Sequence, residues 1–230
     1  MEYLIMTKAL IVLTNVAKYD SLDRPTGLWL SELTHFYDVM RDHQVEVDVV
    51  SPTGGYIPLD PHSMMSMDVT DWKYYQDSDF RNQVLGATLS PDQVVPQDYD
   101  LIYYAGGHGA MWDFPASTVI ADIASQIYQN NGIVAAICHG VAGLLPIKDE
   151  KGEPLVANKR LTGFSNTEEA ANETTDAVPF LAEDALKELG ANYQAGPSFT
   201  SCVQVDGRLL TGQNPQSARD LAETVIEHLG

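Results

Sequence analysis

A thiol, an imidazole and a glycine follow an apolar run near the middle of the chain. The run Ile133 to Ile137 ends in Cys138, His139 and Gly140. Five apolar residues without polar alternation are typical of a strand buried on both faces of a parallel sheet, although a buried helix segment could have the same pattern. Glycine permits a sharp turn, and the residues from Val141 onward suit a helix. Strand, nucleophile and helix in this order predict a nucleophile elbow, with cysteine in the place of serine.

A second loop with candidate chemistry follows another apolar run. Leu101 to Ala105 leads into Gly106, Gly107, His108 and Gly109. Glycines at this density let backbone N–H groups approach a ligand closely, as an oxyanion hole requires, whereas the alternative is an ordinary tight turn. No G-x-G-x-x-G opens a helix here, so the loop is not a dinucleotide-binding fingerprint. Ligands of parallel sheets bind beyond the carboxyl ends of strands, so the two loops predict one site.

The two cysteines differ in their settings. Cys138 follows a strand, adjoins a histidine and precedes a helix, and each feature favours a thiolate. The alternative is packing, because free cysteines are common small hydrophobic residues. Cys202 has none of these neighbours and is predicted to pack within a strand. Adjacent side chains diverge in regular structure, so only a strained turn can bring His139 to Cys138, and we predict a sparsely populated backbone conformation at Cys138.

Composition excludes several classes of function. The 230 residues include 32 acids and 13 bases, and the formal charge of −19 argues against nucleic acid as a partner, because phosphate binding needs clustered Lys and Arg. No apolar run approaches the ~20 residues of a membrane span. Residues 1–14 resemble a first strand rather than a signal peptide, and two cysteines form no disulfide framework, so we expect a cytoplasmic protein. No H-E-x-x-H or C-x-x-C occurs, so a dedicated metal site is not predicted.

Strands and helices must position these loops. Apolar patterns predict strands at 8–14, 45–50, 101–105 and 133–137, and helices at 31–41 and 118–129. Near the C-terminus, Asp206-Gly207 predicts a hairpin turn and Asn214-Pro215 the start of a last helix. This alternation indicates an α/β fold around a mostly parallel, doubly wound sheet in a single domain, residues 1–230. The strand ends at Ala105 and Ile137 should then be adjacent.

Residues 51–99 are the irregular part of the chain. They are rich in turn formers and aromatic residues and are too long for an ordinary connection. Such excursions are typical of lids, binding loops or dimer surfaces. Met64, Met65 and Met67 are predicted to fill gaps in packing rather than to bind a ligand.

Four stretches in order make the chain resemble the ThiJ/PfpI superfamily, which has the class I glutamine amidotransferase-like fold. They are GGHG at 106–109, AICHG at 136–140, TGFSNTEE at 162–169 and DGRLLTGQNPQSA at 206–218. The resemblance is closest to the glyoxalase III and heat-inducible chaperone branch. It implies a three-layer, flavodoxin-like α/β sandwich with a nucleophile elbow at Cys138, and a homodimer. One departure is Gly196-Pro197-Ser198, because many relatives carry tryptophan after the Gly-Pro in this pocket wall.

The resemblance implies a role for each matched residue. Cys138 matches the nucleophile, His139 its neighbouring histidine, and Glu32 the carboxylic acid that lies against the cysteine. By composition alone Glu32 would be a solvated helix residue. Gly107 and the backbone of His139 would supply oxyanion donors. The implied oxyanion and substrate-binding residues are Gly106, Gly107, His108 and Gly140.

An acid in TGFSNTEE is implied to orient His139. The stretch offers two neighbouring candidates, Glu168 and Glu169. The count from Gly163 favours Glu169, and we predict that this carboxylate accepts a hydrogen bond from His139.

The implied activity is that of a glutathione-independent glyoxalase, which converts methylglyoxal, a small dicarbonyl, and water to lactate without a cofactor. Cys138 would form a hemithioacetal, and an acid/base group would move a proton between carbons. Removal of early dicarbonyl adducts from proteins would use the same steps. One alternative is a cysteine peptidase or amidase, which also needs a nucleophile, a histidine and an acid. Another is a holdase chaperone or a redox sensor in which Cys138 is oxidised.

Overall fold

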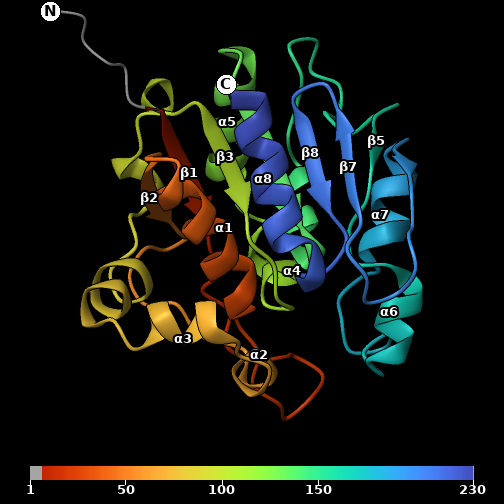
Figure 1. Cartoon of the computed structure of the whole chain (residues 1–230). Coiled ribbons are helices and arrows are strands. Elements are labelled where there is room, and N and C mark those ends of the chain that lie inside the picture. The colour runs from red at the N-terminus through yellow and green to blue at the C-terminus, as the bar shows by residue number, and fades with distance from the viewer. Residues whose placement is uncertain (1–6, 230) are drawn as a thin grey trace, which may run out of the picture.

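A mostly parallel sheet forms the centre of the protein (Figure 1), seen in a computed structural model that describes residues 7–229. The six strands lie in the order β2-β1-β3-β4-β8-β7, and only β7 runs antiparallel to its neighbour. The strands are β1 (Lys8–Val12), β2 (Glu46–Val50), β3 (Leu101–Tyr104), β4 (Ile133–Ile137), β7 (Val203–Asp206) and β8 (Leu209–Gly212). Tyr104 pairs with Ala136, so the carboxyl ends of β3 and β4 are adjacent, as predicted.

Helices cover both faces of this sheet, and the predicted three-layer α/β fold is confirmed (Figure 1). On one face, α1 (Leu30–Asp42) and α8 (Ala218–Leu229) pack on the strands through Phe36, Met40, Leu221 and other apolar residues. On the other face, α4 (Ala110–Asp113), α5 (Thr118–Gln129) and α7 (Ala182–Glu188) bury Ile120, Ile127 and Leu186. Strand side chains alternate between these two cores, which explains the continuous apolar runs in the sequence.

Shorter elements complete the chain. Helix α6 (Asn166–Ala171) and a small second sheet, β5 (Arg160–Leu161) with β6 (Asn192–Tyr193), lie between β4 and β7 in sequence. The predicted strand at residues 1–14 begins at Lys8, and residues 1–6 lie outside the described part of the chain. Between residues 7 and 229, no helix combines the length and the apolar character needed to cross a membrane.

Residues 51–99 contain more regular structure than the sequence suggests. They include α2 (Pro61–Met65), α3 (Val69–Tyr75), a π-helical turn (Phe80–Leu85) and two 3-10 turns (Pro91–Gln93 and Pro96–Asp98). The prediction that Met65 fills a gap in packing is wrong, because this side chain is 83% exposed on α2. Short amphipathic turns of this kind leave too few residues for the helical period to be read from sequence.

The C-terminal hairpin differs by one residue from its prediction. Asp206 pairs with Leu209, so the two turn residues are Gly207 and Arg208, and Gly207 adopts a φ of +62°. Cys202 precedes β7 instead of lying within a strand. Asn214 is the N-cap of a 3-10 turn (Pro215–Ser217) that continues into α8, so the predicted start of the last helix is confirmed.

Candidate active site

Cys138 lies at a sharp turn between β4 and the 3-10 helix η4 (Cys138–Leu144). Its φ is +54°, a left-handed conformation that non-glycine residues rarely adopt, so the predicted strain is confirmed. The turn brings Cys138 Sγ to 3.4 Å from His139 Nδ1. Gly140 permits the close packing of the turn, because a Cβ there would lie 2.4 Å from the carbonyl oxygen of Tyr104. The elbow therefore pairs two side chains that regular structure would separate.

One carboxylate, that of Glu169, binds both histidines of the site. Its Oε2 lies 2.8 Å from His139 Nε2, and its Oε1 lies 2.9 Å from His108 Nε2. The Thr174 hydroxyl donates a further hydrogen bond to Oε1. Burial acts to raise the pKa of Glu169, but the charge of His139 and the hydrogen bonds from both histidines hold this pKa well below its usual range. Glu169 is therefore ionised, and the predicted contact with His139 is present.

Glu168 points elsewhere and holds the surrounding loops. Ser165 is the N-cap of α6, and its backbone N–H donates a hydrogen bond of 3.1 Å to Glu168 Oε2 in a capping box. The Glu168 carboxylate also accepts hydrogen bonds from the backbone N–H of Phe199 and the amide groups of Gln213 and Asn214. The signal was present in the sequence, because S-x-x-E is the capping-box pattern and assigns Glu168 to the helix start. Glu169 is left for the histidines.

Glu32 reaches the elbow from the first turn of α1 and is completely buried. Its Oε2 accepts a hydrogen bond of 2.7 Å from the Gly106 N–H, and its Oε1 has no hydrogen-bond partner within residues 7–229. Burial raises the pKa of Glu32 to about 8, although the Cys138 thiol and the Gly106 N–H act in the opposite direction. The carboxyl is therefore largely protonated at neutral pH, and its unpartnered oxygen can donate towards Cys138.

The protonation of Cys138 depends on Glu32. Burial raises the pKa of the Cys138 thiol well above its usual range, a negative charge on Glu32 raises it further, and the His139 backbone N–H lowers it. The expectation that the strand end, the histidine and the helix favour a resting thiolate is thus wrong, because desolvation outweighs them. A thiolate can form only while Glu32 keeps its proton, since two buried negative charges in contact repel strongly.

Glu32 should make the fold less stable as the pH rises. Its pKa is about 8 in the folded protein and near the ordinary 4.5 in the unfolded chain, so the stability it contributes is lost between these pH values. Glu32→Gln removes this titration, and we expect its melting temperature to exceed that of the wild type by a margin that grows from pH 5 to pH 8. Each kcal/mol corresponds to about 2–4 °C in a chain of this size. Calorimetric melts of both proteins across this pH range test the prediction. A difference in melting temperature that stays constant with pH would contradict a buried, neutral Glu32.

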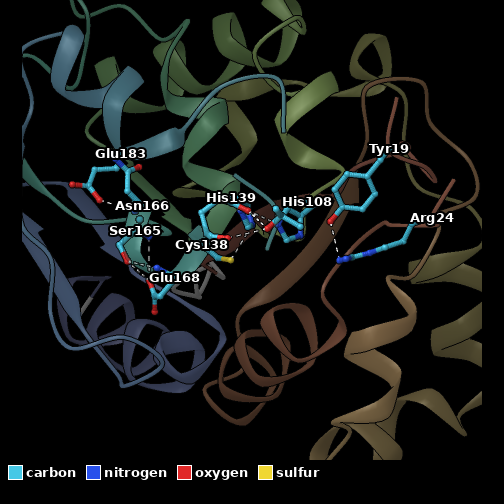
Figure 2. Close-up of polar contacts among 12 residues, drawn as sticks. Tyr19, Arg24, His108, Cys138, His139, Ser165, Asn166, Glu168 and Glu183 are labelled. Atoms are coloured by element: carbon cyan, nitrogen blue, oxygen red, sulfur yellow. Dashed lines mark hydrogen bonds and ion pairs between the residues drawn. The ribbon is translucent and has the colours of Figure 1, made fainter. Parts of the chain in front are cut away.

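Gly106, Gly107 and His108 in the loop after β3 have different roles. Gly106 was expected beside the substrate, but its N–H is engaged by Glu32, which removes it as an oxyanion donor. Gly107 adopts a φ of +102° and packs so tightly that a Cβ would lie 2.2 Å from the Gly27 carbonyl oxygen. His108 is buried, bonds to Glu169 and lines the cavity above Cys138. Figure 2 shows His108 and His139 side by side next to the Cys138 sulfur.

A cavity of about 130 Å³ opens onto the reactive groups. Its wall is formed by Trp29, His108, Cys138, His139, Phe164, Asn172, Phe199, Pro215 and Gln216. Most of these wall residues could not be predicted from the sequence, because loops that are distant in sequence meet here only after folding. Phe199, directly after Gly196-Pro197-Ser198, forms part of this wall. The volume is below the 300–1,000 Å³ of typical drug-sized sites and suits a molecule of a few heavy atoms.

Two clusters in the described residues have metal-ligand spacing. The ligand atoms in each cluster lie within 4.8 Å of one another, in His108, His139 and Glu169, and in His35, Asp68 and Asp71. Hydrogen bonds to Glu169 already use Nε2 of both histidines in the first cluster. In the second, His35 Nε2 lies 3.2 Å from Asp68 Oδ2, and Asp68 caps α3. Hydrogen bonds within the protein therefore account for the first cluster, whereas His35 Nε2 has no hydrogen-bond partner within residues 7–229.

Comparison with known proteins identifies the family. The family model of the DJ-1/PfpI family matches residues 26–228. The chain belongs to this family. HSP31 of Saccharomyces cerevisiae, a glutathione-independent glyoxalase, is 38% identical over 216 residues, which cover 89% of this chain and 90% of that protein. Glyoxalase 3 of Candida albicans is 32% identical over 233 residues, covering 96% and 98%. The predicted membership of the ThiJ/PfpI superfamily is confirmed.

Solved structures extend the likeness to three dimensions. Rapid Encystment Protein 24 kDa of Francisella tularensis superposes with a TM-score of 0.94 at 42% identity, covering 98% of this chain and all of that one. Glyoxalase III of Candida albicans superposes with a TM-score of 0.88 at 30% identity, covering 97% of each chain. The DJ-1/PfpI fold of this chain is therefore shared along almost its whole length.

Proposed function

We propose that this protein is a glutathione-independent glyoxalase, which converts methylglyoxal and water to lactate without a cofactor. Relatives with this activity in their names support the assignment. The observation that carries it is the buried Glu32 carboxyl against the Cys138 thiol, in addition to the His139–Glu169 pair. Acyl transfer needs only a nucleophile, a base and an orienting acid, whereas isomerising a dicarbonyl needs a further group that moves a carbon-bound proton.

His139 and Glu32 both carry protons during the attack on the aldehyde. His139 Nδ1 takes the thiol proton, while the ionised Glu169 holds Nε2–H and stabilises the imidazolium that forms. The Cys138 thiolate adds to the aldehyde carbon, and the developing alkoxide lies near the backbone N–H groups of Gly107 and His139. Protonated Glu32 gives its proton to this oxygen. The result is a hemithioacetal on Cys138 and an ionised Glu32.

The ionised Glu32 is then the base for the proton shift. It removes the hydrogen of the attacked carbon while the imidazolium of His139 protonates the ketone oxygen, which gives an enediol. Glu32 returns the proton to the second carbon, and the first hydroxyl loses its proton to His139. The product is a lactoyl thioester of Cys138, which water hydrolyses to lactate and the free thiol. Burial of Glu32 suits it to this task, because its pKa of about 8 lets it both give and take a proton near neutral pH.

The size of the cavity separates this function from the alternatives. A volume of about 130 Å³ accommodates a three-carbon aldehyde. A peptide substrate needs a longer groove on both sides of the nucleophile, which disfavours a cysteine peptidase. The decisive experiment supplies methylglyoxal to the purified protein without glutathione or metal, measures lactate, and compares the rate with release from peptide and amide reporters. Reporter release without lactate would overturn the proposal.

The neighbouring acids of α6 supply a matched pair of variants. Glu169→Gln removes the charge that fixes the His139 tautomer, and methylglyoxal turnover should fall by about 10²- to 10⁴-fold. Glu168→Gln should instead lower the melting temperature, because Glu168 joins α6 to the loops at Phe199 and Asn214, and turnover should change less. Kinetics and thermal melts of both variants check this. A larger loss of turnover in Glu168→Gln would reverse the assignment of the two acids.

The family resemblance also leads us to propose a cytoplasmic homodimer that removes early dicarbonyl adducts from proteins. Light scattering coupled to size-exclusion chromatography tests the dimer. Release of a methylglyoxal adduct from a model thiol or amine tests the repair activity, which would use the same Cys138 hemithioacetal.

A further inference from the structure

The His108 ring is held in one orientation. Its Nε2 bonds to Glu169 at 2.9 Å, and one neighbour on each side packs against it, with ring centroids 4.0 Å away in His139 and 5.4 Å away in Tyr19. Tyr19 is itself completely buried, and Arg24 donates to its hydroxyl at 3.2 Å. Figure 2 shows this row from Arg24 through Tyr19 and His108 to Cys138. Only 4% of His108 is exposed, so the ring cannot reorient without moving its neighbours.

Nδ1 of His108 is the nitrogen left for a ligand. The ionised Glu169 can only accept hydrogen bonds, so Nε2 carries the proton and Nδ1 carries a lone pair. Within residues 7–229 no hydrogen bond reaches Nδ1, and the ring lines the cavity. Burial and the nearby His139 together lower the pKa of His108 to about 4, so the ring stays neutral when His139 is protonated. An oriented hydrogen-bond acceptor therefore borders the cavity.

Of the other polar groups assigned to the hemithioacetal, the imidazolium of His139 and the backbone N–H of Gly107 are donors. The ionised Glu32 faces the hydrogen of the attacked carbon, which it removes in the next step. The hemithioacetal, however, carries a hydroxyl on the attacked carbon, and a buried hydroxyl without an acceptor is unfavourable. We propose that Nδ1 of His108 accepts the hydrogen bond of this hydroxyl and so orients the hemithioacetal on Cys138. The inference rests on the proposed glyoxalase function and adds a substrate-contacting residue to it.

Two substitutions separate this role from support of Glu169. In His108→Gln the side-chain amide lies near the position of Nε2, so it can still donate to Glu169 but offers no acceptor in place of Nδ1. In His108→Asn the side-chain oxygen can replace Nδ1, but the bond to Glu169 is lost. Two rates are measured for each variant, kcat/KM for methylglyoxal and the alkylation of Cys138 by iodoacetamide. Alkylation reports on the thiolate and its His139–Glu169 support without needing a hydroxyl acceptor.

We expect kcat/KM of His108→Gln to fall about ten- to hundredfold, the effect of one lost hydrogen bond to a buried group, with alkylation unchanged. In His108→Asn, alkylation and turnover should fall together. Unchanged turnover in His108→Gln, or a parallel loss of its alkylation, would overturn the inference. Absence of lactate formation by the wild type would instead refute the glyoxalase function itself.

A measurement on the wild type tests the same hydrogen bond without a substitution at His108. Acetaldehyde can form a hemithioacetal with Cys138 but has no second carbonyl, so the reaction stops there. Accepting a hydrogen bond should move the ¹⁵N resonance of His108 Nδ1 to lower frequency when acetaldehyde is added, and Cys138→Ala should abolish the change. An unchanged resonance in the acetaldehyde-saturated wild type would overturn the inference, whatever the kinetics of the variants.

Discussion

Cys138→Ala should reduce methylglyoxal turnover to the uncatalysed background, a loss on the order of 10⁶-fold if the nucleophile matters here as it does in other covalent mechanisms. Every later step of the proposed reaction takes place on a carbon bonded to the Cys138 sulfur. His139 and Glu32 then have no intermediate on which to act. Lactate formation by the purified variant, corrected for spontaneous hydration and rearrangement, measures the effect.

Cys202→Ala is the matched control, because Cys202 is the other cysteine of the chain and lies near the turn at Gly196 rather than in the cavity. It should retain wild-type turnover. Circular dichroism of both variants checks that the fold is intact. Substantial lactate formation by a folded Cys138→Ala would rule out the covalent mechanism and favour direct proton abstraction by Glu32.

Glu32→Gln should lower turnover by the ~10²- to 10⁴-fold typical of a lost general base. The glutamine amide keeps the shape of the side chain, and its NH₂ group can still donate to the Cys138 sulfur. It cannot take the hydrogen of the attacked carbon. The variant should therefore retain a thiol that iodoacetamide alkylates while it fails to complete the proton shift, and the two rates should separate.

Deuterium at the aldehyde carbon of methylglyoxal sharpens this experiment. If Glu32 carries the proton, the residual turnover of Glu32→Gln should be limited by breaking of the carbon–hydrogen bond and show a primary isotope effect. Near-normal turnover in this variant would make Glu32 a structural partner of Gly106 and leave His139 as the proton carrier. Loss of alkylation in parallel with turnover would place the role of Glu32 in forming the thiolate alone.

Local sequence patterns were sufficient to predict the structure where it depends on a single strand or helix. The buried strand Ile133–Ile137 and the helix Thr118–Gln129 have the predicted bounds, because continuous burial and a long helical stripe each leave an unambiguous pattern. The strain at Cys138 could be predicted as well, since only a strained turn brings the side chains of two adjacent residues, Cys138 and His139, together. The short helices within residues 51–99 could not be predicted in this way, because they have too few residues to show a helical period.

Which residues can react, and at which strand ends they lie, could be predicted from the sequence alone. The glycine loop and the elbow follow neighbouring parallel strands, and this alone brings residues 106–108 to Cys138. The protonation of these residues and their hydrogen-bond partners depend on the folded structure. The pKa of Glu32 rises and that of Glu169 falls although both are buried acids, because burial dominates at Glu32, whereas two imidazoles outweigh it at Glu169. Charge depends on the distance and desolvation of groups from separate elements, and those quantities exist only once the chain has folded.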